Sequence, residues 1–343
     1  MTAHHRGIPI PHYRPQQSDR LTDNHGRPIT YLRLAITDRC NLRCRYCMPA
    51  GGVDFLPHAE ILSFEELERL VRLLSAMGVS KVRITGGEPF ARHGCLSFMR
   101  RLQGLDTVRS LHVTTNGVET CRHLDELAEL GIAGINLSLD TLDRDRFEQI
   151  TRRDQLQEVL STFKGCIGRS LPLKINAVVL EDTTDTEIQT LADLSRRHPL
   201  SMRFIEKMPF SGCVGGKPQG TMPLRERLHA LFPAMMPVVG APSSTARLYA
   251  IPGFAGTIGL IEGNSRRFCA TCNKIRITPT GMLKTCLYDN GVLDLKGMLR
   301  NGADDRDITA AVKAVVACRY RDGLETEANC ARAIDPTMAS IGG

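Results

Sequence analysis

Three cysteines lie close together in the segment TDRCNLRCRYCMP, near the start of the chain. Cys40, Cys44 and Cys47 have the spacing C-x3-C-x2-C and follow an apolar segment that predicts a strand. Three thiolates in one short loop can bind three irons of a four-iron cluster and leave the fourth iron open to an added ligand. A structural zinc loop is the alternative, but it usually takes four protein ligands from paired C-x2-C elements. We therefore predict an iron–sulfur cluster with an open iron.

A second trio lies in the segment FCATCNKIRITPTGMLKTCL. Cys269, Cys272 and Cys286 have the spacing C-x2-C-x13-C, again without a fourth cysteine in the segment. A zinc ribbon is the main alternative, in which Cys318 or Cys330 would supply the fourth ligand. The second trio is thus a second candidate cluster site.

The cellular compartment decides whether the cysteines are expected to form disulfides or to bind a metal. No apolar run approaches the roughly 20 residues needed to span a bilayer, and the first residues lack the apolar core of a signal peptide. We predict a cytoplasmic protein without a membrane partner. Disulfides are rare in that reducing compartment, so clustered members of the 12 cysteines are expected to be metal or cluster ligands.

Basic residues outnumber acidic residues. The chain has 44 lysines and arginines against 37 aspartates and glutamates, which gives a formal net charge of +7. This charge favours an anionic partner, such as a nucleotide or a nucleic acid. Because the chain has no tryptophan, 5% aromatic residues and no long basic block, extended base stacking on a nucleic acid is disfavoured. A small phosphorylated ligand is the better expectation.

Apolar β-prone segments alternate with amphipathic helical patterns along the first part of the chain. The predicted strands are 31–36, 81–85, 111–115, 135–139, 173–180 and 202–205. The predicted helices are 63–77, 95–103, 121–130, 142–150, 155–168 and 185–197, the first with Ser63 as its N-cap. Such alternation is typical of parallel α/β folds, so we expect a parallel sheet or an incomplete barrel.

Composition changes at both ends of this pattern. Residues 1–28 are rich in Pro, His, Arg and Gln without periodicity, which predicts a flexible N-terminal extension. The Gly- and Pro-rich stretch PFSGCVGGKPQGTMP follows Met208 and indicates a boundary there. We therefore predict a barrel region over 29–210 and a C-terminal region over 211–343, with short strands over 245–290 and a helix over 308–318.

The first trio also has an aromatic residue, Tyr46, in the pattern C-x3-C-x-aromatic-C, which resembles the signature of radical S-adenosylmethionine (SAM) enzymes. Residues 85–89, TGGEP, follow the second predicted strand and resemble the glycine-rich SAM loop of that family. The resemblance implies an incomplete (β/α)6 barrel in which the open iron holds SAM and one electron cleaves it to a 5′-deoxyadenosyl radical. It implies SAM contacts from Tyr46, Gly86, Gly87, Glu88, Ser138 and Met208.

Two trios at these spacings, with CNKIR in the second, resemble the GTP 3′,8-cyclase family (molybdenum cofactor biosynthesis protein A) over residues 21–343. This resemblance implies a second [4Fe-4S] cluster in the C-terminal extension, whose open iron binds the guanine of GTP. It implies GTP contacts from Arg33, Arg83, Thr114, Lys174, Lys274 and Arg276. The family commonly has arginine where this chain has Lys274, which keeps the charge but loses the bidentate fork.

The chain ends in Gly342 and Gly343, which resemble the family's Gly-Gly tail. In that family the tail reaches into the active site and assists the rearrangement. Two terminal glycines are equally compatible with an unstructured end. Relatives commonly carry arginine at the position of Pro336, two residues before Met338, so the path of the tail is expected to differ.

The implied reaction joins C3′ to C8 of GTP after hydrogen abstraction from C3′, and gives 3′,8-cyclo-7,8-dihydro-GTP for molybdenum cofactor synthesis. The resemblance further implies cyclic pyranopterin monophosphate synthase as the downstream enzyme, an electron donor such as flavodoxin or ferredoxin, and a homodimer. Two other functions stay open at this point. A radical-SAM peptide maturase would usually carry more auxiliary cysteines, and a non-enzymatic zinc-binding adaptor would contain zinc without sulfide.

Overall fold

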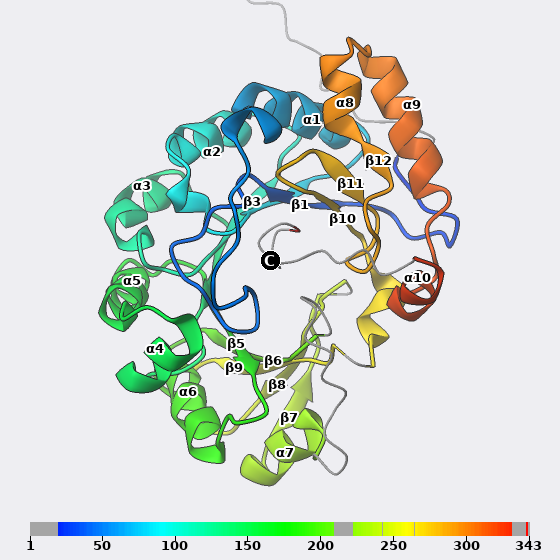
Figure 1. Ribbon diagram of the computed structural model, residues 1–343. Coiled ribbons are helices and arrows are strands. Elements are labelled where there is room, and N and C mark those ends of the chain that lie inside the picture. Colours follow the sequence, from blue (N-terminus) through cyan, green and yellow to red (C-terminus); the bar gives the residue numbers. More distant parts are fainter. Residues whose placement is uncertain (1–19, 209–221, 242, 264, 331–340, 342–343) are drawn as a thin grey trace, which may run out of the picture.

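A single sheet, curved into an open barrel, forms the centre of the molecule (Figure 1). The structure, a computed structural model, describes residues 20–208, 222–241, 243–263, 265–330 and 341. Within them the sheet has 12 strands in the order β12-β11-β10-β1-β2-β3-β4-β5-β6-β9-β8-β7. The first six in chain order are β1 (Tyr31–Ala35), β2 (Lys81–Thr85), β3 (Ser110–Thr115), β4 (Gly134–Ser138), β5 (Leu173–Val179) and β6 (Ser201–Glu206). Each is parallel to its neighbour, as the alternating pattern predicts.

Helices cover the outer face of these strands (Figure 1). They are α1 (Phe64–Ala76), α2 (Cys95–Gln103), α3 (Leu124–Glu129), α4 (Arg144–Thr151), α5 (Leu156–Gly168) and α6 (Asp185–Arg197), with short 3-10 turns at η2 (His58–Glu60), η3 (Pro89–Ala91) and η4 (Thr120–His123). The Ser63 hydroxyl accepts from the Glu66 amide, and the Glu66 carboxylate accepts from the Ser63 amide. This capping box fixes where α1 begins, as its sequence predicts.

Strand residues alternate between the two faces of the sheet. Leu32 and Leu34 of β1, and Val82 and Ile84 of β2, are fully buried in the hydrophobic core. The residues between them therefore face the inside of the barrel. Because side chains alternate with a period of two, the polar side chains of successive strands all lie on the inner face and form one wall.

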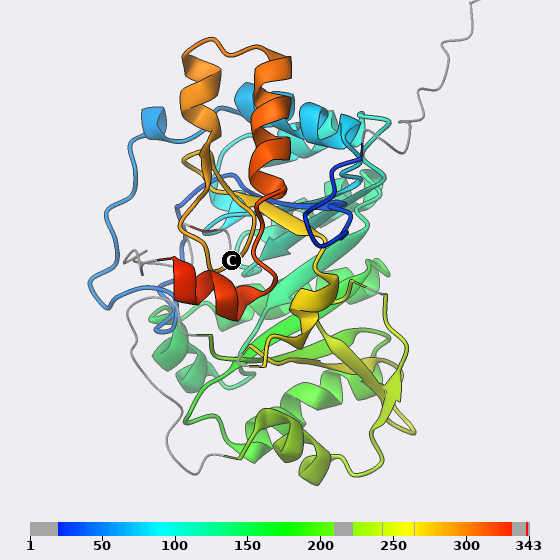
Figure 2. The same cartoon turned by 90° about the vertical axis from the view of Figure 1, so that its right-hand side faces the viewer.

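Strands of the C-terminal region complete both edges of the same sheet. β9 (Thr257–Ile261) pairs in parallel with β6, and β10 (Lys274–Ile277) pairs in parallel with β1. Outside them lie the antiparallel strands β7 (Met236–Val238), β8 (Arg247–Ala250), β11 (Met282–Lys284) and β12 (Leu293–Asp294). The remaining helical elements are α7 (Leu224–Leu231), η5 (Arg267–Thr271), α8 (Leu295–Arg300), α9 (Asp305–Val316) and α10 (Gly323–Asn329). Figure 2 shows α8 and α9, in orange, beside the blue α1.

All six predicted strands are confirmed to within one residue, and the six predicted barrel helices to within two. The helix predicted over 121–130 is divided into η4 and α3, and the helix predicted over 308–318 is α9. The division at residue 210 stays a prediction. Among the described residues, none of the helices has the length and apolar character required to cross a membrane.

The structure differs from the predicted flexible extension over its last residues, 20–28. The Leu21 amide donates to the Met77 carbonyl at 2.8 Å, and Leu21 is buried in the core. Asp23 and Arg27 form a buried ion pair at 2.6 Å. Composition could not reveal this, because one apolar anchor and one ion pair leave no periodic pattern. Residues 1–19 lie outside the described residues.

Candidate active site

A cavity of about 600 Å³ lies inside the curved sheet, a size suited to small-molecule ligands. The strand side chains that point inward line it together with the two cysteine loops. The predicted site residues that line it are Arg33, Cys40, Cys44, Tyr46, Cys47, Arg83, Gly86, Gly87, Thr114, Ser138, Lys174, Met208, Cys269, Cys272, Lys274, Arg276 and Cys286. Glu88 does not line it, and Gly342 and Gly343 lie outside the described residues.

Basic residues occupy the inner wall in two layers set by strand register. Arg33 is in register with Arg276 on one side and Arg83 on the other, and we call these three the arginine layer. Two residues earlier on the same strands, Tyr31 is in register with Lys274 and Lys81. We call these three residues the lysine layer. Parallel pairing without a shift therefore stacks cations of three strands side by side.

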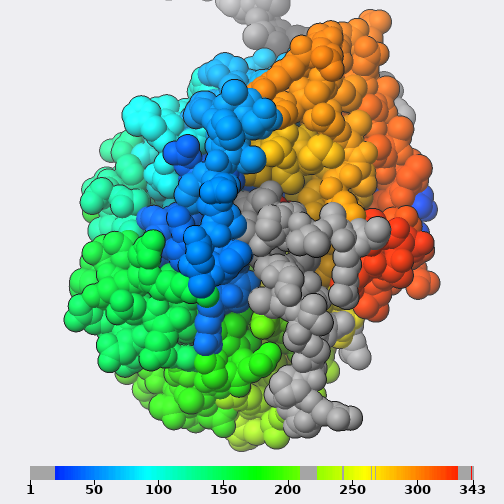
Figure 3. Space-filling view, viewed as in Figure 1, coloured from blue at the N-terminus to red at the C-terminus, as the bar shows by residue number. Residues whose placement is uncertain are grey.

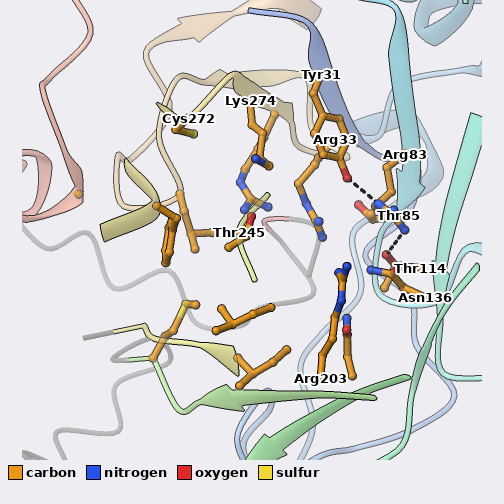
Figure 4. A pocket seen from close by; sticks show the side chains of 18 of the residues that line it. Tyr31, Arg33, Arg83, Thr85, Thr114, Asn136, Arg203, Thr245, Cys272 and Lys274 are labelled. Carbon is orange, nitrogen blue, oxygen red and sulfur yellow. Dashed lines mark hydrogen bonds between the residues drawn. The ribbon is translucent and has the colours of Figure 1, made fainter. Parts of the chain in front are cut away.

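Two further cations face these layers from the other side of the cavity. Lys174 of β5 and Arg203 of β6 line it, and Figure 4 shows the guanidinium of Arg203 pointing toward that of Arg33. Arg203 Nε and Arg276 Nη1 are buried donors without a hydrogen-bond partner among the described residues. Buried donors without partners are costly, so this arrangement is suited to an anionic ligand.

The pKa shifts of these groups reflect their crowding. Burial and the nearby cation of Arg276 lower the pKa of Arg33 to about 9. Burial and the charge of Arg203 lower the pKa of Lys174 to about 8. Polyphosphate oxygens in the cavity would raise the pKa values of Arg33 and Lys174, because a nearby negative charge favours the protonated form.

Tyr31 is the acidic group of the lysine layer. Its hydroxyl oxygen accepts from Arg83 Nε at 2.6 Å (Figure 4), and its ring centre lies 4.8 Å from Lys81 Nζ and 5.4 Å from Lys274 Nζ. Burial would raise the pKa of Tyr31, but Arg83 and Arg33 lower it to about 7. A phenol in this setting can exist as a phenolate near neutral pH and offset part of the positive charge.

The first cysteine loop follows β1 and crosses the face of the molecule beside the yellow and orange C-terminal residues (Figure 3). The Arg43 amide donates to Thr151 O at 2.9 Å, which ties the loop to the end of α4. Burial raises the pKa of Cys40 to about 12 and that of Cys44 well above its usual value. Thiols with raised pKa values lose their protons readily only when a cation, such as an iron ion, binds the sulfur atoms. Three such thiols in one loop therefore fit an iron–sulfur cluster.

The glycine pair in TGGEP serves the contact between two loops. A Cβ on Gly86 would lie 2.5 Å from Thr37 O, and one on Gly87 would lie 2.3 Å from Arg39 O. The Gly87 amide donates to Thr37 O at 2.8 Å, and the Glu88 amide donates to Arg39 O at 2.7 Å. The glycines thus let this loop close directly on the segment that enters the first cysteine trio.

Glu88 faces the protein interior, in contrast to the SAM contact predicted for it. Its fully buried carboxylate accepts from the Thr115 hydroxyl at 2.8 Å and from the Asn116 amide nitrogen at 2.7 Å. Burial raises the pKa of Glu88 to about 7. The Asn116 side-chain nitrogen Nδ2 lies 3.6 Å from Cys40 Sγ, so Asn116, whose backbone amide is held by Glu88, connects this buried carboxylate to the first trio.

Three other residues predicted to contact SAM, Tyr46, Ser138 and Met208, line the same cavity. Tyr46 donates to Asp140 Oδ2 at 2.7 Å, which fixes its ring beside the cysteines. Burial raises the pKa of Asp140 to about 6. Ser138 lines the cavity at the end of β4, and Met208 lines it where the Tyr288 hydroxyl lies 3.7 Å from its sulfur.

The second cysteine loop lines the same cavity as the first. Cys269 is buried, while Cys272 and Cys286 are half-buried. Burial would raise the pKa of Cys272, but the cations of Arg319 and Lys274 lower it. Cys318 and Cys330, the alternative zinc ligands, do not line the cavity.

The geometry of the two trios bears on the metal they could hold. Within the described ranges, no three His, Cys, Asp or Glu side chains are gathered as a site for one metal ion. In a four-iron cluster each thiolate binds a different iron, so the ligands need not surround one point. Three cysteines on each side of a cavity are a donor set of that kind.

Several cavity residues were missed from the sequence, among them Tyr31, Lys81, Arg203 and Arg319. The first three alternate with core residues along predicted strands, so the period of two could have identified them. Arg319 follows α9 with no local pattern around it, and no sequence signal marks it.

Comparison with known proteins agrees with this geometry. Residues 34–195 match the radical SAM superfamily, and residues 200–323 match the family described as Molybdenum Cofactor Synthesis C. A GTP 3′,8-cyclase of Pelotomaculum thermopropionicum is 39% identical over 307 residues, which cover 87% of this chain and 94% of that protein. Human molybdenum cofactor biosynthesis protein 1 is 39% identical over 304 residues, 88% of this chain and 48% of the human protein.

A solved structure shows the same fold at low identity. Streptococcus suis SuiB aligns with a TM-score of 0.59 and 14% identity, over 88% of this chain and 72% of that chain. At this identity the likeness concerns the fold alone. From the two matched families and the curated relative that it covers almost completely, the chain belongs to the radical SAM superfamily and, within it, to the GTP 3′,8-cyclase family.

Proposed function

We propose that this chain is a radical SAM lyase that converts GTP to 3′,8-cyclo-7,8-dihydro-GTP, a step of molybdenum cofactor biosynthesis. One observation carries the proposal: both cysteine trios and the arginine and lysine layers line one cavity. A site for SAM, a site for a guanine and a site for a triphosphate are thereby combined. The curated relative named GTP 3′,8-cyclase supports the same activity.

Membership of the radical SAM superfamily implies a [4Fe-4S] cluster and SAM. Cys40, Cys44 and Cys47 would hold that cluster, which supplies the electron that cleaves SAM to a carbon radical. Tyr46, Ser138 and Met208 line the cavity and would position SAM. The task of these residues is to place the reacting carbon against the substrate, because the cofactor itself carries the hard chemistry.

The basic layers would bind the triphosphate. It carries about four negative charges near neutrality, and guanidinium groups donate charge-assisted hydrogen bonds to phosphate oxygens in bidentate fashion. Arg203 and Arg276 each have a buried donor atom available for this purpose. Thr114 would keep its present role, since its hydroxyl accepts from Arg83 at 3.3 Å and orients that guanidinium.

A second [4Fe-4S] cluster belongs to the proposal. Cys269, Cys272 and Cys286 would hold it and leave one iron for the guanine, with the predicted Gly342 and Gly343 tail assisting the rearrangement. Lys274 contributes charge without a fork, and its ammonium donates to Ser243 O at 2.8 Å. We also propose a homodimer, a flavodoxin or ferredoxin as reductant, and cyclic pyranopterin monophosphate synthase as the enzyme that uses the product.

Anaerobic reconstitution with iron and sulfide tests the proposal. With SAM, dithionite and GTP, mass spectrometry should detect 5′-deoxyadenosine and the cyclised nucleotide, and the loaded chain should hold about eight irons. Replacing Cys269, Cys272 and Cys286 with Ala should abolish cyclisation while some SAM cleavage remains. The matched control is the Cys318→Ala and Cys330→Ala double variant, which changes two cysteines outside the cavity.

Three results would contradict parts of this assignment. Normal cyclisation by the triple variant would remove the second trio from the site. Deoxyadenosine without a GTP product would keep the superfamily chemistry but reject GTP. Zinc without sulfide in the purified chain would reject both clusters.

A further inference from the structure

The second cysteine trio has a buried cation directly on one of its sulfur atoms. Arg319 Nη2 lies 3.0 Å from Cys272 Sγ, and the same guanidinium donates to the carbonyls of Cys272 at 2.9 Å and Lys274 at 3.2 Å. Arg319 is only 4% exposed. Three acceptors on one short segment fix the guanidinium, so its position against the sulfur is determined by the fold.

One buried carboxylate balances this cation. Asp23 Oδ2 lies 3.4 Å from Arg319 Nη1 and also accepts from Arg27 Nε at 2.6 Å. Arg27 Nη1 donates to the Cys269 carbonyl at 2.9 Å, so the same ion network contacts both cysteines of the C-x2-C pair. Two guanidinium groups share one carboxylate, so this ion network itself carries a net positive charge. A separate buried carboxylate, that of Asp289, accepts from the Cys286 amide at 2.7 Å.

A sulfur atom of the first trio also has a side-chain donor. Asn116 Nδ2 lies 3.6 Å from Cys40 Sγ, and Asn116 is held by Asn41 Oδ1 at 2.7 Å. Asn116 carries no charge, so Asn116 at Cys40 and Arg319 at Cys272 are different kinds of donor to a sulfur atom.

We propose that Arg319 is a positioning residue that raises the reduction potential of an iron–sulfur cluster held by Cys269, Cys272 and Cys286. This inference rests on the second cluster of the proposed function. Reduction adds one electron, and so one negative charge, to a cluster without moving a proton. A buried cation hydrogen-bonded to a ligand sulfur stabilises that added charge, and both hydrogen bonds to sulfur and nearby charge set such potentials.

The carboxylate gives the inference a second, opposite test. Asp23 lies on the far side of Arg319 and weakens its field, so Asp23→Asn should raise the midpoint potential. Asparagine keeps an oxygen for the His25 and Arg27 amides, which donate to Asp23 Oδ1 at 3.0 and 2.9 Å. A purely structural role would not move the potential in opposite directions in the two variants.

The experiment is an EPR-monitored redox titration with dithionite on the full chain, loaded with iron and sulfide. Replacing Cys40, Cys44 and Cys47 with Ala removes the first cluster, so that one signal is read. In this parent, Arg319→Gln should lower the reduced-to-oxidised ratio at fixed ambient potential at least tenfold, about 59 mV for one electron. Arg122→Gln is the matched control, because its side chain is 76% exposed, pairs with Glu119 and does not line the cavity.

The outcomes separate this inference from the proposed function. A lower midpoint in Arg319→Gln, a higher one in Asp23→Asn and an unchanged one in Arg122→Gln support the role of Arg319. An unchanged midpoint in a fully loaded Arg319→Gln variant overturns it. If the Arg319→Gln variant does not retain the cluster, the midpoint potential of Asp23→Asn decides: a higher midpoint supports the role of Arg319, and an unchanged or lower midpoint overturns it. A parent without any cluster overturns the second cluster itself.

Discussion

Replacing Gly87 with alanine should separate the two loops that support the first cysteine trio. The new Cβ would lie 2.3 Å from Arg39 O, whereas ordinary contact begins at 3.4 Å, so the backbones must part by about 1.1 Å. Overpacking of this kind costs about 1–3 kcal/mol. The hydrogen bonds to Thr37 O and Arg39 O would weaken as well, and each contributes about 1 kcal/mol. We expect a total loss of about 2–4 kcal/mol.

Thermal unfolding and iron content measure this effect together. For a chain of 343 residues the unfolding entropy is about 0.7 kcal/mol/K, so the loss should lower Tm by roughly 3–6 °C. Iron per chain should fall as well, because Arg39 directly precedes Cys40. The control is Gly51→Ala, whose Cβ would meet no atom within 4 Å. A Gly87→Ala variant with the Tm and iron content of the control would refute the reasoning that loop contact requires this glycine.

Two further predictions concern the basic layers. Because Arg83 and Arg33 lower the pKa of Tyr31 to about 7, the phenol should be neutral below that pH and a phenolate above it. A difference titration at 295 nm between wild type and Tyr31→Phe should show this step, and bound GTP should move it to higher pH; a step near pH 10 would contradict the expectation. Arg203→Ala should weaken GTP binding about tenfold to a hundredfold by calorimetry, since a charged hydrogen bond contributes about 1.5–3 kcal/mol. Arg122→Ala, at a side chain 76% exposed, should leave the affinity unchanged, and equal affinities of the two variants would exclude Arg203 from the site.

The barrel could be predicted from sequence because its signals are local. The core positions Leu32 and Leu34 alternate with Tyr31 and Arg33 within five residues, and Ser63 marks the start of α1 by its own hydrogen bond. Such patterns act over one or two turns of chain, and the structure follows them to within two residues. The cysteine trios are local in the same sense, since each lies within a short segment of the sequence.

The contacts around the second trio could not be predicted because they join distant parts of the chain. Asp23 and Arg319 are 296 residues apart, and their pairing depends on β10 lying beside β1. The role of Glu88 was also hidden. A carboxylate after two glycines is compatible with a ligand contact or with a buried support, and only the positions of Thr115 and Asn116 decide between them.

The register of the sheet explains why the residues of this site are expected to lower the folding stability of the protein without a bound ligand. Parallel pairing without a shift places Arg276, Arg33 and Arg83 side by side, and burial keeps water from screening their repulsion. A ligand with several negative charges removes that repulsion and gives the buried donors partners. Under the proposed function, the same residues would lower the stability of the free protein and raise its affinity for a triphosphate, which is the exchange expected where a fold is shaped for binding.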